Sequence, residues 1–185
     1  MTGETALIAA AKKGSVPAFT KLVGTYQEGL LRFLVTRAAS YADAEDALQD
    51  TLINAYRYLH SYDSEWRFST WLYRIAINNL SKMRALDVVA DVEVDDLSEQ
   101  EGGPLEQCIR DADRENLWVS AKRLLSDEVY SALWLRYVED MSVKDISAVM
   151  DRSVSWTKVN LSRARKQLDT ELNKAKLKNT RNAYG

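Results

Sequence analysis

Aromatic and cationic side chains alternate through a short stretch in the first half of the chain. Four aromatic residues fall within eight positions, Trp66, Phe68, Trp71 and Tyr73, with Arg67 among them and Arg74 directly after them. Aromatic rings stack on bases that have left the double helix, at roughly 1–3 kcal/mol per base. The alternative is that such rings belong to a protein core. We expect some of the four to be core residues, and Trp66 and Arg67 to be more accessible because they lie in a loop.

A polar and cationic helix face follows the aromatic stretch. Arg74, Asn78, Ser81 and Lys82 recur at helical spacing, opposite the apolar positions of the same segment. The candidate surface for opened nucleic acid therefore comprises Trp66, Arg67, Trp71, Arg74, Asn78 and Lys82.

A second basic face lies near the end of the chain. A short apolar helical pattern and the turn at 151–153 precede a longer helix, whose predicted buried stripe is Thr157, Leu161, Ala164 and Leu168. Short helix, tight turn and longer helix form the helix-turn-helix arrangement, in which the second helix enters the major groove of DNA. The outward residues that would read DNA are Ser155, Trp156, Lys158, Val159, Ser162 and Arg163. An ordinary helical hairpin with a solvated charged face is the alternative.

An acidic and polar face marks the segment before the aromatic stretch. Its members recur along one side of a predicted helix: Asp43, Asp46, Gln49, Asp50 and Asn54. These carboxylates would repel nucleic acid, whereas a protein partner with a basic helix would fit them. A solvated helix face is again the alternative.

Charge is nearly balanced overall, with 25 Lys and Arg against 27 Asp and Glu, but it is unevenly distributed. From Arg152 to the end, nine basic residues face two acids, a net charge of +7. From Asp87 to Glu115, eleven acids face two arginines, a net charge of −9. The basic end is compatible with nucleic acid, because a phosphate backbone responds to the local field.

The composition also argues against several classes of function. Cys108 and His60 are the only residues of their types, so neither a disulfide within the chain nor a Cys- or His-based metal centre is expected. We expect no cofactor, no catalytic residues and no enzyme activity. The sequence has no run of 18 apolar residues, and we expect a cytoplasmic protein without direct membrane insertion.

Apolar residues recur at helical spacing nearly throughout, which predicts an all-α fold. The expected helices cover residues 5–13, 18–36, 40–59, 69–86 and 112–124, followed by those of the helix-turn-helix. Ser69, Ser142 and either Ser153 or Ser155 are expected helix caps, and a further helix is expected to open at 126–128. The predicted organisation is two small helical domains, 1–88 and 112–175, joined by a flexible acidic linker at 89–111 and followed by a frayed tail at 176–185.

Four motifs, in this order, resemble one protein family: ADAEDALQD at 42–50, FSTWLYRIA at 68–76, LRYVEDMS at 135–142 and SRARKQL at 162–168. The chain resembles bacterial sigma factors of the extracytoplasmic-function (ECF) group. These are small sigma-70 relatives that keep only the region 2 and region 4 domains. The similarity covers about residues 15–88 and 113–172, and the four motifs together are highly specific.

The resemblance implies a role for each candidate surface. The acidic face, with Asp46, Gln49 and Asp50, would contact the beta-prime clamp helices of core RNA polymerase, and the beta flap is a further expected contact. The aromatic and basic surface would capture the melted minus-ten element, with Asn78 at the pocket for a flipped-out base. Lys158, Val159, Ser162 and Arg163 would lie on the helix that reads the minus-thirty-five element. Promoter DNA and an anti-sigma factor are the other expected partners.

The chain departs from the family where the last helix begins. Family members commonly have Gly-Thr-Val there, whereas this chain has Ser155-Trp156-Thr157. The promoter sequence preference of the family therefore cannot be transferred to it.

Two rival interpretations come from other classes. A helix-turn-helix regulator that binds operators as a dimer would explain the second basic face and leave the aromatic stretch unexplained. A helical adaptor without a DNA role would predict that charge reversal at Lys158 and Arg163 has no effect on transcription.

Overall fold

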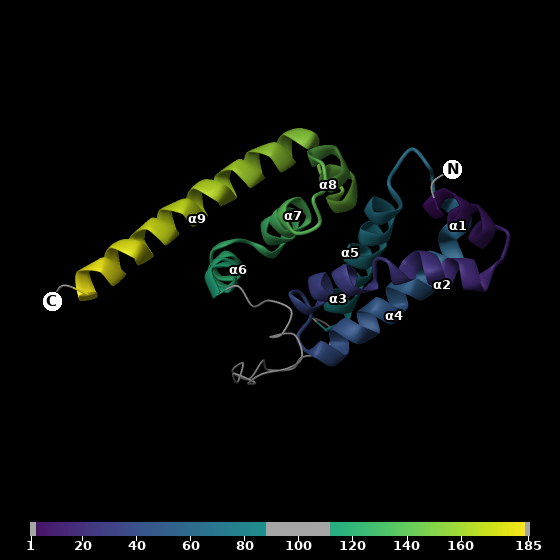
Figure 1. The fold of residues 1–185 in the computed structure, drawn as a ribbon, viewed down its shortest axis with the longest axis horizontal. Helices are drawn as coiled ribbons and strands as arrows, with labels where there is room; N and C mark the ends of the chain where they lie inside the picture. Colours follow the sequence, from purple (N-terminus) through teal and green to yellow (C-terminus); the bar gives the residue numbers. More distant parts are fainter. Residues whose placement is uncertain (1–2, 88–111, 184–185) are drawn as a thin grey trace. The chain divides into compact units, whose positions relative to one another are not determined.

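A computed structural model of the chain describes residues 3–87 and 112–183, and the regular structure of these residues is helical (Figure 1). The chain divides into two compact units, Met1–Val94 and Asp95–Gly185. The predicted all-α fold with two helical domains is therefore confirmed. The acidic linker predicted at 89–111 lies outside the described residues.

The first unit contains five α-helices: α1 (Gly3–Lys12), α2 (Val16–Gly24), α3 (Gln27–Val35), α4 (Tyr41–Tyr58) and α5 (Phe68–Asp87). Gly14 has a φ of +92° in the turn after α1, a conformation that glycine adopts without steric cost. Ser15 and Ser40 cap α2 and α4, because each hydroxyl oxygen accepts from a backbone N–H three residues later. A short 3-10 helix (Leu59–Ser61) links α4 to the loop before α5.

The core of the first unit lies where α2 to α5 meet. Its most buried large side chains come from α2, α3 and α5: Leu22, Leu30, Phe33, Leu34, Phe68, Leu72 and Tyr73. The rings of Phe33 and Tyr73 pack edge to face, with centroids 5.4 Å apart. Small residues of α4, Ala44, Ala47 and Ala55, are fully buried and let this helix approach its neighbours closely. This packing fixes α4 and α5 side by side, and both carry candidate site residues.

The single helix predicted over 18–36 is wrong, because the segment forms two helices. The first helix ends at Gly24, a residue that weakens a helix interior by about 1 kcal/mol. The Thr25 hydroxyl then donates to the Leu22 carbonyl at 2.7 Å, and the Tyr26 N–H donates to the Val23 carbonyl at 2.9 Å. The new direction places the Tyr26 ring 5.7 Å from that of Phe68.

The expected cap at Ser69 is also wrong. The fourth predicted helix begins one residue earlier, at Phe68, so that Ser69 lies inside its first turn. The Trp71 N–H donates to the Arg67 carbonyl at 3.3 Å, which makes Arg67 the residue that flanks the helix.

The second unit contains α6 (Ala112–Leu124), α7 (Asp127–Tyr137), α8 (Val143–Met150) and α9 (Val154–Ala183). Ser126, Ser142 and Ser153 cap the last three helices, which confirms the cap expected at Ser142 and selects Ser153 over Ser155. Thr157, Leu161, Ala164 and Leu168 are buried, which confirms the predicted stripe along α9. Helix α9 continues to Ala183, into the segment expected to be a frayed tail.

Helices α8 and α9 are joined by the predicted three-residue turn, whose first residue, Asp151, has a left-handed backbone with φ +52°. The Arg152 N–H in this turn donates to the Ser147 carbonyl at 3.0 Å, which closes the end of α8. Helices α7, α8 and α9 pack against one another, and the α8–turn–α9 segment is a helix-turn-helix. In the part of the chain that the structure describes, no helix is long and apolar enough to cross a membrane.

Candidate nucleic-acid interface

The exposed side of α5 carries a line of predicted DNA-binding residues. Arg67, Trp71, Arg74 and Asn78 recur at i, i+4, i+7 and i+11, so they share one face of the helix. Arg67, Arg74 and Asn78 are exposed, while Trp71 is partly buried. The structure thus brings four of the six predicted residues together. Lys82 lies within α5, but its side chain is outside the described part of the structure.

Trp71 is partly buried because it belongs to an aromatic cluster at the start of α5. Its ring lies 5.4 Å from that of Tyr62 and 5.5 Å from that of Phe68. Phe68 is fully buried, and Tyr73 is 1% exposed. The expectation that some of the four aromatics are core residues is therefore confirmed, and Trp71 stands between the core and the exposed face.

The loop before α5 is held more firmly than its sequence indicated. The Tyr62 hydroxyl donates to the Trp66 carbonyl at 2.6 Å, across the loop. Lys12 of α1 donates from Nζ to the Tyr62 carbonyl at 2.7 Å, and the same ammonium lies 5.3 Å from the centre of the Tyr62 ring. Trp66 is partly buried, and only Arg67 of the two predicted loop residues is exposed. Residues 62–66 are therefore braced by α1, a contact that spans 50 positions of the sequence.

A second contact of α1 reaches the same aromatic cluster. The Tyr26 hydroxyl donates to Glu4 Oε2 at 2.5 Å. Burial raises the pKa of Tyr26, and this hydrogen bond to Glu4 raises it further. Burial likewise raises the pKa of Tyr62. Both phenols are therefore protonated at neutral pH and serve as hydrogen-bond donors.

The acidic face of α4 lies on the side of that helix that points away from the core. Asp46, Gln49 and Asp50 are exposed, opposite the buried Ala44, Ala47 and Ala55. Ile53 follows on the same face, at i+3 from Asp50 and i+4 from Gln49, and is 55% exposed. Ile53 was not among the predicted site residues, although its spacing to the acidic residues is visible in the sequence. The acidic face thus includes an apolar contact point, which suits a protein partner.

The other two predicted residues of that face lie at its border and have contacts within the protein. Asp43 accepts from the Ser40 hydroxyl at 2.7 Å, at the start of α4. Asn54 donates to Asn79 Oδ1 of α5 at 3.1 Å, and Asn79 in turn donates to the buried Thr51 hydroxyl at 3.3 Å. Asn54 therefore links the two helices through a polar bridge next to Asn78.

The predicted DNA-reading residues of α9 also form one face. Ser155, Lys158, Val159, Ser162 and Arg163 are exposed, and Val159 is 44% exposed despite being apolar. Trp156 is only partly buried, and its carbonyl accepts from the Asn160 side chain at 2.9 Å. The face offers two cations, two hydroxyls and an apolar contact, the groups that read base edges in a major groove.

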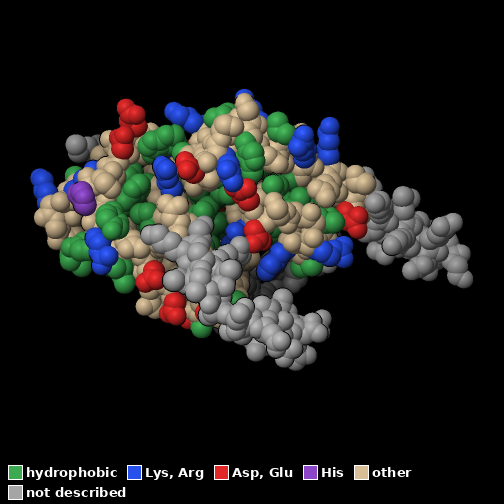
Figure 2. Space-filling model, turned by 180° about the vertical axis from the view of Figure 1, so that it is seen from behind, with side chains coloured by type: hydrophobic (Ala, Val, Ile, Leu, Met, Phe, Trp, Pro, Cys, Tyr) green, Lys and Arg blue, Asp and Glu red, His purple; other side chains and the backbone are tan. Residues whose placement is uncertain are grey.

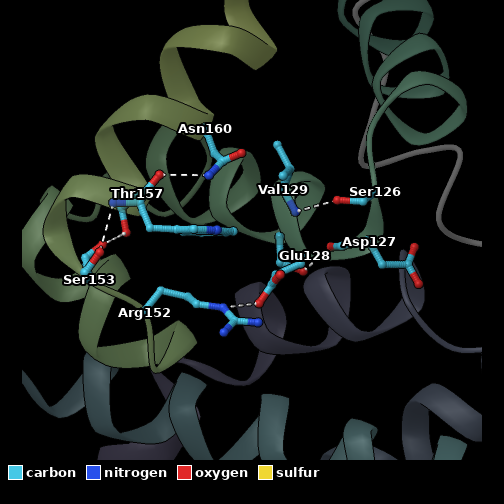
Figure 3. A network of polar contacts seen from close by, with 10 residues as sticks. Ser126, Asp127, Glu128, Val129, Arg152, Ser153, Thr157 and Asn160 are labelled. Atoms are coloured by element: carbon cyan, nitrogen blue, oxygen red, sulfur yellow. Dashed lines mark hydrogen bonds and ion pairs between the residues drawn. The ribbon is translucent and has the colours of Figure 1, made fainter.

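A network of polar contacts surrounds the start of α9 (Figure 3). Arg152 Nε donates to Glu128 Oε1 of α7 at 2.6 Å, and its guanidinium carbon lies 5.6 Å from the centre of the Trp156 ring. The Ser153 hydroxyl accepts from the Trp156 N–H at 3.0 Å. Glu128 and Arg152 were not among the predicted site residues, because residues 24 positions apart give no periodic signal.

Acidic and basic side chains are mixed on the face of the molecule that Figure 2 shows. Within the described residues, no group of three or more His, Cys, Asp or Glu side chains could hold a metal ion. The arrangement can bind charged and aromatic partners, but the charge available at each face is modest.

The fold is that of a helical protein with two units, the second of which contains a helix-turn-helix. The candidate binding faces lie on α4, α5 and α9. Comparison with known families matches "Sigma-70 region 2" to residues 22–85 and "Sigma-70, region 4" to residues 120–168. The ECF RNA polymerase sigma-E factor of Salmonella typhimurium (strain LT2) is 30% identical over 180 residues, which cover 90% of this chain and 92% of the relative. The corresponding factor of Haemophilus influenzae is 29% identical over 178 residues, which cover 90% of this chain and 94% of the relative.

Solved structures show the same fold. CnrH, in complex with the cytosolic domain of CnrY, matches with a TM-score of 0.68 at 24% identity, over 92% of this chain and 97% of that chain. The sigma factor RpoE of Bartonella quintana, in complex with the anti-sigma factor NepR, matches with a TM-score of 0.66 at 23% identity, over 85% and 98%. The chain belongs to the ECF group of sigma-70 family RNA polymerase sigma factors. The prediction of a promoter-recognition subunit of RNA polymerase is confirmed at this level.

Proposed function

We propose that the chain is a dissociable promoter-specificity subunit in which each candidate face has a separate task. The observation that carries this proposal is that one unit presents an acidic face on α4 and a cationic-aromatic face on α5. A protein that only bound duplex DNA would have no use for the first face. The proposal includes no enzymatic activity. We propose that the protein acts in the cytoplasm.

The acidic face of α4 is assigned to core polymerase. Asp46, Gln49 and Asp50 would pair with basic residues of the beta-prime clamp helices, and Ile53 would add apolar burial at the centre of the contact. Asp43 and Asn54 lie at the rim of the contact. Because their side chains already bond to Ser40 and Asn79, we propose that they contribute less to the binding energy. The beta flap is assigned to the second unit on the family resemblance alone.

The exposed face of α5 is assigned to the minus-ten element. Arg67 and Arg74 would contact phosphates, and Trp71 and Trp66 would offer ring faces to unstacked bases. Asn78 would bind the edge of a flipped-out base, for which an amide supplies both a donor and an acceptor. Lys82 would extend the basic side of this face. Because residues 62–66 are braced by α1, little ordering entropy remains to be lost on binding.

Helix α9 is assigned to the duplex minus-thirty-five element. Lys158 and Arg163 would donate to phosphates or guanine edges, Ser162 to either, and Val159 would contact a thymine methyl group. Ser155 and Trp156 would lie at the groove edge, near the end of α9 that enters first.

Neither DNA-reading face is expected to bind promoters tightly alone, because the charge at each is modest. Core polymerase would hold both units along one DNA molecule, so that the second contact forms at a high effective concentration. An anti-sigma protein is a further proposed partner, which follows from membership of the ECF group.

Reversal of one charge on α4 tests the polymerase assignment. Asp50→Lys should weaken binding to core polymerase at least about tenfold, which corresponds to roughly 1.4 kcal/mol for a contact at a protein interface. Asp169→Lys makes the same charge change at an exposed position of α9 and serves as the matched control. If both variants compete equally with the wild-type chain for core polymerase, the assignment of α4 is wrong.

A second variant separates opening from duplex binding. Asn78→Ala should reduce permanganate reactivity of minus-ten thymines in the complete holoenzyme, while the footprint over the minus-thirty-five element stays unchanged. Equal loss of both signals would contradict the division of tasks between α5 and α9.

A further inference from the structure

Arg152 occupies the turn that leads into the proposed DNA-reading helix. It directly precedes Ser153, the cap of α9, and its side chain is 48% exposed. Its Nε donates to Glu128 Oε1 at 2.6 Å, and its guanidinium lies over the Trp156 ring. Figure 3 shows Glu128 of α7 and Arg152 of the turn pointing toward each other. The guanidinium is therefore held from two sides, by a carboxylate and by an indole.

This arrangement is poorly explained as a stabilising ion pair. The partners are 48% and 38% exposed, and exposed pairs contribute only about 0–1 kcal/mol to stability. What the two contacts do achieve is a fixed direction for a side chain that otherwise has several free rotations. A fixed arginine beside a DNA-reading helix reduces the entropy lost on binding a ligand.

The chemistry of the guanidinium points to an anionic ligand. An arginine has five N–H donors in a planar fork, and the bond to Glu128 uses Nε. Donors on the two terminal nitrogens can therefore bind oxygen atoms, and phosphate oxygens match the fork geometry. In a helix-turn-helix, side chains next to the recognition helix contact the DNA backbone and fix the register of that helix.

Glu128 has a second effect, because an acid near DNA would repel phosphates. The ion pair with Arg152 offsets the charge of Glu128 and at the same time orients the guanidinium of Arg152. The Trp156 ring contacts the guanidinium from its other side, 5.6 Å from ring centre to guanidinium carbon. We propose that Arg152 binds a backbone phosphate next to the minus-thirty-five element, and that Glu128 and Trp156 are positioning residues for its guanidinium. This inference rests on the proposed role of α9.

The salt dependence of binding measures phosphate contacts directly. The full-length chain is combined with core polymerase, and binding to a promoter duplex is measured over a series of salt concentrations. Arg152→Gln should lower the slope of log K against log salt by about 0.9, the value for one phosphate on duplex DNA. Arg152→Lys keeps the charge and should retain most of the slope.

The matched control is Arg123→Gln. Arg123 also pairs with a glutamate, Glu171, at 3.5 Å, and it is 70% exposed. Glu171 lies 17 residues along α9 from Val154, about 25 Å from the start of the helix at 1.5 Å per residue. This variant should leave the slope unchanged. Equal slopes for Arg152→Gln and Arg123→Gln would overturn the proposal.

A double-mutant cycle tests the positioning role of Glu128. Removal of an acid near DNA by Glu128→Gln should tighten binding in the Arg152→Gln background. In the wild-type background the gain should be smaller by more than about twofold, because Arg152 loses its orientation there. Identical gains in both backgrounds would refute the role of Glu128.

The control measurement separates this inference from the proposed function. A wild-type holoenzyme that does not prefer promoter DNA over other DNA refutes the proposed function itself. A wild-type holoenzyme that does prefer it, with an unchanged slope for Arg152→Gln, refutes only the role of Arg152.

Discussion

Replacement of Lys12 by methionine tests whether α1 braces the loop that presents the minus-ten face. The change keeps most of the aliphatic length and removes the ammonium. It therefore deletes the 2.7 Å bond to the Tyr62 carbonyl and the cation–π contact at 5.3 Å. Tyr62 in turn holds the Trp66 carbonyl, so the effect should reach the whole loop.

The magnitude follows from the two contacts. A cation over an aromatic ring contributes about 0.5–1 kcal/mol at an exposed site. A hydrogen bond contributes about 0.5–1.5 kcal/mol net, and Lys12 is exposed, which argues against the larger values for buried charged donors. The sum is about 1–2.5 kcal/mol. If it falls on the loop alone, the population of open loop should rise roughly 5–70-fold.

Two assays report on this change. Hydrogen exchange at residues 62–67 of the free chain should accelerate by that factor, and promoter opening by the holoenzyme should slow while polymerase affinity stays unchanged. Lys13→Met is the matched control, because Lys13 is the exposed neighbour that follows α1. If Lys12→Met and Lys13→Met behave alike in both assays, the brace has no role in loop order.

Three further predictions concern stability. Asn79→Ala should lower the free energy of unfolding by about 1–3 kcal/mol, because it leaves Asn54 and buried Thr51 without their shared partner, and urea titration measures this. Ser142→Ala should cost about 1 kcal/mol by removing the cap of α8, whereas Ser155→Ala, one residue inside α9, should cost less in the same titration. The pKa of Tyr26 is raised in the folded state, so its contribution is present below the unfolded value of about 10 and is lost as pH rises above it. The free energy of unfolding should therefore fall more steeply between about pH 9 and 11 in the wild type than in Tyr26→Phe, and parallel curves would contradict this.

Periodicity and capping predicted the helices that carry the site. The stripe of Thr157 and Leu161 and the cap at Ser153 located α9, since both depend on residues within a few positions of each other. The spacing of Asp46 and Asp50 likewise predicted the exposed side of α4 correctly. Local patterns of this kind suffice wherever one helix face is buried and the opposite face is solvated.

These local patterns could not predict contacts between segments that are far apart in the sequence. Lys12 and Tyr62 are 50 positions apart, and Glu128 and Arg152 are 24 positions apart. The break after Gly24 was missed for a related reason, because the apolar stripe of 18–36 continues across it. The direction of Tyr26 toward Glu4 and Phe68 is a property of the packed unit. Such pairs decide which predicted site residues are held and which stay exposed.

The central claim is that two weak DNA-reading faces act together only when core polymerase holds them on one promoter. Promoter binding and run-off transcription, measured with the chain alone, core polymerase alone and the two combined, test this most directly. We expect promoter-dependent initiation from the combination and neither initiation nor specific binding from either component alone. A chain that fails to associate with core polymerase, or that binds the promoter specifically without it, would contradict the account.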